Sequence, residues 1–196
     1  MMNTAMAAIV SGTNWGPDYE AYYESWRVIT RAKQLQRLGG ALEPLYWQAA
    51  RIRGLARSYR GFNVGCAVYA YRADAGHPAD RWGTFYGMNV KVNKEAPKIC
   101  AEVIAISAAY AAGYTEVLGI VVVGEPQLDV HSGLECKTLH PCHECRLFLR
   151  DHPIVPRHAR IITALPPVEL SSEEDDKAWW ETQTLNQLLR LHKEST

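Results

Sequence analysis

The sequence has no excess of charge of either sign, because 21 Lys and Arg residues balance 21 Asp and Glu residues among its 196 positions. Proteins that hold long nucleic acids usually carry a basic balance or a basic stripe, since they must neutralise phosphates. We therefore expect a small-molecule partner, and a protein that acts on nucleic acid is the weaker alternative. The hydrophobic content of 47% is typical of a soluble domain with a substantial core.

Two further features are missing. No apolar run approaches the roughly 20 residues that a membrane-spanning helix needs, and the first ten residues lack the basic start of a secretory signal. The five cysteines are an odd number, which favours reduced thiols over a framework of disulfides. We expect no membrane partner and a cytoplasmic location.

Two short motifs stand out against this background. One is Cys100-Ala101-Glu102, and the other is a Cys-x-x-Cys pair formed by Cys142 and Cys145. Three cysteines can hold one Zn²⁺ and leave a position open, which distinguishes a catalytic zinc site from a closed structural one. Zinc lowers the pKa of bound water, and a nearby carboxylate can carry the protons. The pattern predicts a hydrolytic site.

The residues around the motifs predict that each motif opens a helix. The first helix should run from Cys100 to Ala112 and end at Gly113. The second should run from Cys142 to Leu149, with Pro141 at a position where proline is tolerated. The free N–H groups and the dipole of a helix start favour thiolates. Two helix starts would then face one metal ion.

A structural site is the alternative. Cys136, His140 and His143 lie in the same loop as the Cys-x-x-Cys pair and can complete a closed set of four ligands. The protein would then be a zinc-stabilised binding protein without catalysis. The local cluster leaves both interpretations open, but a structural site does not need Cys100-Ala101-Glu102, so the upstream motif favours catalysis.

Together the motifs resemble the signature of the three-cysteine cytidine deaminases. The resemblance covers roughly Pro44 to Leu149 and the tail more loosely. It implies an α/β/α sandwich with a mixed central sheet, and hydrolytic conversion of the amine of a small cytosine compound to a carbonyl with release of ammonia. It also implies a homo-oligomer, with a tetramer expected first and a dimer second.

The resemblance assigns roles to individual residues. Glu102 would be the proton shuttle, and the backbone N–H of Ala101 would help to hold the amino or carbonyl end of the substrate. The expected Zn²⁺ ligands are Cys100, Cys142 and Cys145.

The substrate pocket is expected to include residues of two further stretches. Tyr59 to Ala67 resembles the family's opening run, in which Phe62 would flank the pyrimidine; the alternative is a core phenylalanine. Asn89 keeps the family's spacing to the first zinc cysteine, where family members grip the sugar hydroxyls with an asparagine and a glutamate. Lys91 stands at that glutamate's position. An ammonium only donates hydrogen bonds and prefers anions, so we expect a charged cytosine derivative, unless Lys91 points to water.

The sequence departs from the family elsewhere too. Val103 stands where an arginine usually moderates the charge of the thiolates, so another cation must do so: Arg146 is the first candidate and His143 a weaker one. Four further arginines form either a solvated basic face or a patch near an anionic ligand. They are Arg51, Arg53, Arg57 and Arg60.

We expect residues 1–40 to form an N-terminal arm and an extra helix, and residues 41–196 to form the deaminase domain. The extra helix should span Asp18 to Leu38 and end at Gly39-Gly40. The other expected elements are helices at Pro44 to Tyr59 and Thr182 to Leu191, and strands at Phe62 to Tyr69, Trp82 to Val90, Leu118 to Val123 and Ala159 to Ala164.

Overall fold

The computed structural model describes residues 38–167 and 180–193. The predicted arm and nearly all of the predicted extra helix lie outside these ranges, and the division at residue 40 stays a prediction. Within the described part of the chain, every helix is too short or too polar to cross a membrane.

The core of the protein is a five-stranded sheet in the order β3-β2-β5-β8-β9. Its strands are β2 (Gly65–Tyr71), β3 (Trp82–Met88), β5 (Glu116–Val123), β8 (Arg160–Ala164) and β9 (Trp180–Thr184). Strand β2 runs antiparallel to both β3 and β5, β5 runs parallel to β8, and β8 runs antiparallel to β9. The predicted mixed sheet is therefore confirmed, and the strands predicted from residue patterns lie within a few residues of their expected positions.

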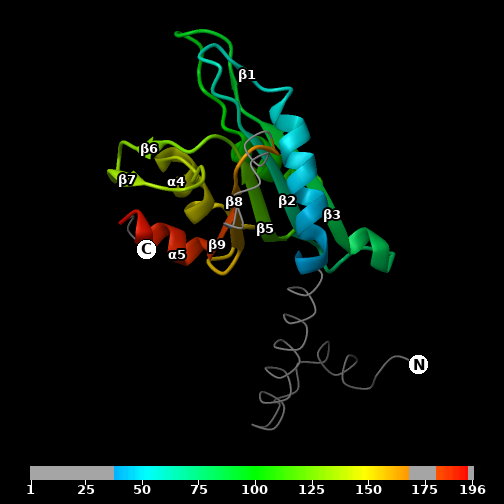
Figure 1. Cartoon of the computed structure of the whole chain (residues 1–196). Helices are drawn as coiled ribbons and strands as arrows, with labels where there is room; N and C mark the ends of the chain where they lie inside the picture. Colours follow the sequence, from blue (N-terminus) through cyan, green and yellow to red (C-terminus); the bar gives the residue numbers. More distant parts are fainter. Residues whose placement is uncertain (1–37, 168–179, 194–196) are drawn as a thin grey trace, which may run out of the picture. The chain divides into compact units, whose positions relative to one another are not determined.

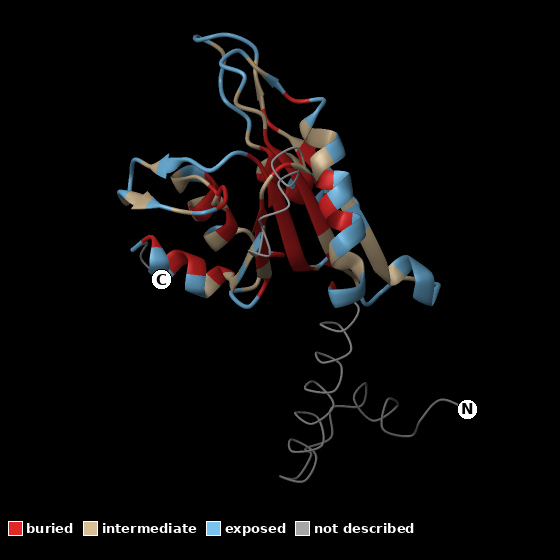
Figure 2. Ribbon diagram, viewed as in Figure 1, coloured by how far each residue is buried: buried red, intermediate tan, exposed pale blue. Residues whose placement is uncertain are grey.

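The central strands β2, β5 and β8 are largely buried. Successive side chains of a strand point to opposite faces of the sheet, so each of these strands contributes to the packing on both faces. In β2, Val68 and Ala70 belong to a core cluster that includes Ile106, whereas Ala67 belongs to a second cluster that includes Tyr46. Strand β5 is apolar and buried along nearly its whole length, as expected of a central strand covered on two sides. Figure 2 shows the buried strands between the helices.

Helices form the two outer layers. The helix over residues 38–53 packs one face of the sheet through Leu45 and Tyr46. Helices α3 (Ala101–Ala111), α4 (His143–Asp151) and α5 (Leu185–Leu191) all contribute to the cluster on the other face. In Figure 1 the first helix lies on one side of the sheet, and α4 and α5 lie together on the other. This is the predicted three-layer α/β/α arrangement.

A close approach seats α3 on the sheet. A Cβ atom at Gly87 of β3 would lie 2.1 Å from the carbonyl oxygen of Ala101, in the first turn of α3. Glycine at this position lets the helix start contact the strand backbone directly. The start of α3, which carries Cys100 and Glu102, is therefore held against β3.

The first described helix differs from the prediction at both ends. Gly39 and Gly40 lie inside it rather than ending a helix. Glycine costs about 1 kcal/mol in a helix, and burial of Leu38 and Leu45 against the sheet offsets that cost. The helix ends at residue 53, not at Tyr59. The residues that follow form β1 (Arg57–Ser58), which pairs in parallel with β4 (Val90–Lys91).

The C-terminal segment was predicted as one helix from Thr182, which is wrong for its first residues. Residues 180–184 form β9, the edge strand paired with β8. Thr184 then caps α5 through a capping box, in which its side chain and that of Gln187 each bond the other's backbone N–H. The remaining short elements are a 3₁₀ turn, Pro78–Arg81, and the strands β6 (Leu128–Asp129) and β7 (Leu134–Glu135).

Candidate active site

The two cysteine motifs meet at the starts of two helices. Cys100 is the N-cap of α3 and Cys142 is the N-cap of α4, and neither side chain caps its own helix. Their sulfurs lie 3.7 Å apart. Cys145 lies in the first turn of α4, and its sulfur is within 4.8 Å of the other two. The prediction that both motifs open helices is confirmed, and the structure brings the three thiols together.

The three thiols fit one zinc ion. Two sulfurs bound tetrahedrally at 2.3 Å from a zinc ion would lie about 3.8 Å apart, close to the 3.7 Å between Cys100 and Cys142. Hydrogen bonds from Cys100 and Cys145 lower the pKa of the Cys142 thiol, against the opposing effect of burial. The set therefore already favours a thiolate, which is the form that binds metal.

The residues considered above as additional zinc ligands, Cys136, His140 and His143, do not belong to the three-cysteine set. Cys136 and His140 belong to a separate set of potential ligands, with His192, and not to the three-cysteine set. His143 stacks on His131 with ring centroids 3.7 Å apart. The arrangement thus favours three protein ligands over the closed site considered above.

Glu102 is buried in the first turn of α3, beside the thiols. Burial raises the pKa of its carboxyl group to about 7, and the negative charge of Cys142 adds to the effect. A carboxyl with a pKa close to neutrality can both accept and return a proton. This is the property that the predicted proton shuttle requires.

A cavity of about 330 Å³ opens next to these groups. Its lining includes seven of the eight residues that we expected in the site, namely Phe62, Asn89, Lys91, Cys100, Ala101, Glu102 and Cys142. The eighth, Cys145, is buried. The structure therefore gathers the expected site residues around one cavity.

Asn89 has a clear structural task at the cavity wall. Its Oδ1 accepts a hydrogen bond from the backbone N–H of Val64 at 2.7 Å, and its Nδ2 donates to the carbonyl of Phe62 at 2.8 Å. These two bonds hold the segment that enters β2. Asn89 therefore positions Phe62, which packs against the core cluster at the edge of the cavity.

The cavity lining is rich in cations. Arg60, Lys91 and Lys98 contribute to it, and Glu102 is the single carboxylate among its described lining residues. The ammonium of Lys91 lies 5.7 Å from the centre of the Tyr59 ring. The remaining arginines of the predicted patch are not among those lining residues, and one of them, Arg53, forms an ion pair with Glu125 at 2.8 Å.

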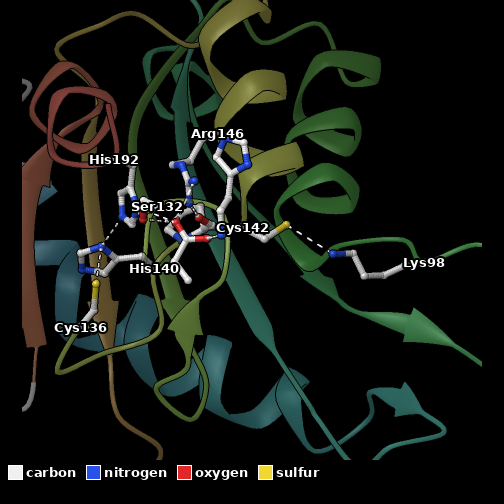
Figure 3. A network of polar contacts seen from close by, with 10 residues as sticks. Lys98, Ser132, Cys136, His140, Cys142, Arg146 and His192 are labelled. Atoms are coloured by element: carbon white, nitrogen blue, oxygen red, sulfur yellow. Dashed lines mark hydrogen bonds and ion pairs between the residues drawn. The ribbon is translucent and has the colours of Figure 1, made fainter. Parts of the chain in front are cut away.

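Lys98 is a cation that the sequence analysis missed. Its ammonium lies 3.5 Å from the sulfur of Cys142. Figure 3 shows the two side chains pointing toward each other. Arg146, the expected candidate, is fully buried; it donates to the carbonyl of Pro141 at 2.8 Å and pairs with Asp129 at 2.9 Å. The only signal in the sequence for Lys98 is its place two residues before Cys100.

Comparison with known proteins supports this interpretation of the site. Residues 43–156 match the family model of the cytidine and deoxycytidylate deaminase zinc-binding region. The chain belongs to this family. It is therefore a zinc-dependent deaminase that acts on cytosine compounds.

Solved structures of bacterial cytidine deaminases are similar to the chain. Cytidine deaminase from Burkholderia pseudomallei is 23% identical, with a TM-score of 0.52, over 74% of this chain and 94% of that one; this likeness supports the fold. Cytidine deaminase from Mycobacterium leprae is 25% identical, with a TM-score of 0.49, over 76% of this chain and 96% of that one. No curated protein matches the chain.

Proposed function

We propose that this deaminase acts on a small cytosine nucleoside or nucleotide that carries an anionic group. It converts the exocyclic amine to a carbonyl and releases ammonia. The observation that carries the proposal is the cavity itself, in which a buried carboxyl and two of the three clustered thiols lie together with Arg60, Lys91 and Lys98.

Cys100, Cys142 and Cys145 are the proposed ligands of one Zn²⁺. When bound, zinc supplies the Lewis-acid chemistry that activates water near neutral pH. The support for this ligand set is the 3.7 Å separation of the Cys100 and Cys142 sulfurs at two helix starts.

Glu102 moves the protons. It accepts one proton from the water whose oxygen bonds to the ring carbon, and gives that proton to the ring nitrogen. It then takes the remaining proton from the new hydroxyl and gives it to the amine, which leaves as ammonia as the carbonyl forms. Its burial keeps competing water away.

The backbone N–H of Ala101 lies in the first turn of α3, where N–H groups have no partner within the helix. It helps to hold the amino or carbonyl end of the substrate. Phe62 flanks the ring.

Lys91 binds the anionic end of the substrate. It lies on β4, which pairs with β1, and the chain just after β1 brings Arg60 to the same cavity. A phosphate or carboxylate beside an ammonium gains about 1.5 to 3 kcal/mol from a charge-assisted hydrogen bond. That gain corresponds to roughly tenfold or more in affinity. A neutral nucleoside would not form this charge-assisted hydrogen bond and would not gain this affinity.

A substrate panel tests this proposal. The zinc-loaded chain is incubated with cytosine, cytidine, cytidine and deoxycytidine monophosphates, an acidic cytidine derivative and a short single-stranded oligonucleotide, and ammonia release gives kcat/KM for each. Lys91→Glu should lower kcat/KM for the charged compounds roughly tenfold or more and shift preference towards cytidine. Lys94→Glu is the matched control, because Lys94 is an exposed lysine outside the cavity lining.

The possible results separate the alternatives. Equal kcat/KM for cytidine and its charged relatives, unchanged by Lys91→Glu and by salt, would reject the anionic substrate. Zinc retention without turnover of any compound would favour a zinc-stabilised binding protein. Turnover of the oligonucleotide alone would indicate a nucleic-acid editor.

We also propose a homo-oligomer, tetramer or dimer, and a monomeric mass in light scattering at micromolar concentration would reject it.

A further inference from the structure

A second set of potential metal ligands lies outside the three-cysteine site. The sulfur of Cys136 is 3.3 Å from Nδ1 of His140, and that nitrogen is 3.0 Å from Nε2 of His192. All three ligand atoms lie within 4.8 Å of one another. Figure 3 shows the three side chains converging. They come from the loop after β7, the segment before α4 and the residue that follows α5.

Two carboxylates determine which nitrogen of each histidine carries its proton. Nδ1 of His192 lies 2.7 Å from Oδ2 of Asp129, and Nε2 of His140 lies 3.3 Å from Oε2 of Glu181. A carboxylate accepts hydrogen bonds, so each of these nitrogens donates. The opposite nitrogens, Nε2 of His192 and Nδ1 of His140, then present lone pairs.

These lone pairs face each other. Two acceptor nitrogens lie 3.0 Å apart, and Cys136 has a single thiol proton to share between them. The Cys136 thiol lies against Nδ1 of His140, which leaves Nε2 of His192 without a proton donor among the described residues. His192 is buried, so bulk water does not reach that nitrogen. A cation at the point where the three atoms converge would satisfy all of them. Histidine ligands whose other nitrogen donates to a carboxylate are the usual arrangement around zinc.

We propose that Cys136, His140 and His192 bind a second metal ion. One thiolate and two neutral imidazoles suit zinc best among the common divalent ions. The two carboxylates orient the histidines rather than bind the ion. The proposal does not depend on the identity of the substrate, and these three residues do not belong to the three-cysteine set.

The second ion has a structural task. His140 precedes the zinc-site residue Cys142 by two positions, and His192 follows α5 directly. An ion held between them ties α5 to the segment that delivers Cys142 to the cavity. Arg146 strengthens the same link, since it pairs with Asp129 at 2.9 Å and donates to the carbonyl of Pro141 at 2.8 Å. The ion therefore stabilises the end of the sheet where the cavity lies.

Metal content per chain tests the proposal. The full chain is loaded with Zn²⁺, freed of loose metal by gel filtration and analysed by mass spectrometry for zinc per chain. We expect two ions in the natural chain and one in Cys136→Ser, which is nearly isosteric and alters a half-buried side chain. His158→Gln is the matched control, because His158 is exposed, pairs with Glu116 and belongs to neither set of potential ligands; it should keep two ions.

His192→Gln provides a second test, with circular dichroism to show that each variant is folded. It too should bind one ion. Replacement of zinc by Co²⁺ should give a sulfur-to-cobalt absorption band that weakens, but does not vanish, in Cys136→Ser. A zinc content that is the same in the natural chain, Cys136→Ser and His192→Gln would overturn the proposal. If the three-cysteine site alone fails, the natural chain would bind one ion, and Cys136→Ser would bind none.

Discussion

The ammonium of Lys98 lies 3.5 Å from the sulfur of Cys142 and 3.5 Å from a carboxylate oxygen of Glu144. Partial burial opposes the charged form of Lys98, but the negative charges of Cys142, Cys100 and Glu144 outweigh it and raise its pKa. Lys98 is therefore a cation beside the thiol whose pKa is lowered, Cys142. Val103, at the position after Glu102, carries no charge, whereas Lys98 places a cation 3.5 Å from the sulfur of Cys142.

Lys98→Met should weaken zinc binding. The substitution removes a charge-assisted contact to a thiolate, and the loss should be roughly tenfold in affinity at pH 7. Because the thiols must lose protons to bind metal, the deficit should grow at lower pH and shrink at higher pH. Titration against a competing chelator at several pH values measures it. Lys94→Met is the control, and equal affinities for the two variants would contradict the prediction.

Glu102→Gln should keep the metal and lose turnover. The amide has nearly the same shape as the buried carboxyl but cannot accept a proton, so kcat should fall by roughly 10² to 10⁴. Ammonia release and zinc content are measured on the same sample. Loss of zinc together with activity would show instead that Glu102 supports the thiols, and retained activity would show that another group moves the protons.

Asn89→Ala should destabilise the fold as well as impair the site. The two hydrogen bonds from Asn89 to Val64 and Phe62 are lost, which should lower the free energy of unfolding by about 2 to 3 kcal/mol. Asn89→Asp keeps the acceptor but turns the donor into a second acceptor that faces the carbonyl of Phe62. Urea unfolding of both variants measures the effect. Unchanged stability with a raised KM would indicate that Asn89 acts on the substrate alone.

The parts of the fold that could be predicted are those determined locally. The starts of α3 and α4 follow from the cysteine motifs and from Pro141, and the end of α3 follows from Gly113, all within a few residues of the helices. Strand β5 follows from its continuous apolar run. Strand β9 is polar and takes its conformation from pairing with β8, so its residues carry no pattern that distinguishes them from a helix.

The missed contacts of the site are long-range. Lys98 and Cys142 are 44 positions apart, and His140 and His192 are 52 apart, so the fold alone brings each pair together. Cys136 and His140 were recognised as potential ligands, but only the position of α5 shows that His192 completes their set. Asn89 was recognised by its spacing, which does not reveal its bonds to neighbouring backbone.

Asp129 should make stability depend on acid pH. Burial opposes its charged form, but hydrogen bonds from Ser132 and from the backbone N–H of His131, with the nearby charge of Arg146 and a bond from His192, lower its pKa from 3.8 to about 2. A carboxyl whose pKa is lowered by folding stabilises the folded state above its unfolded pKa, and this contribution is lost as pH falls through the folded value.

The stabilisation by Asp129 should therefore be complete at pH 5 to 7 and decline between about pH 4 and pH 2. Its pH-dependent part should be about 1 to 2 kcal/mol, because water screens part of the interaction. Asp129→Asn cannot ionise, so the difference in free energy of unfolding between the natural chain and this variant should narrow over that range. Urea unfolding at pH 7, 5, 4 and 3 measures the difference. A gap that stays constant with pH would mean that Asp129 acts by its shape and hydrogen bonds, and not by its charge.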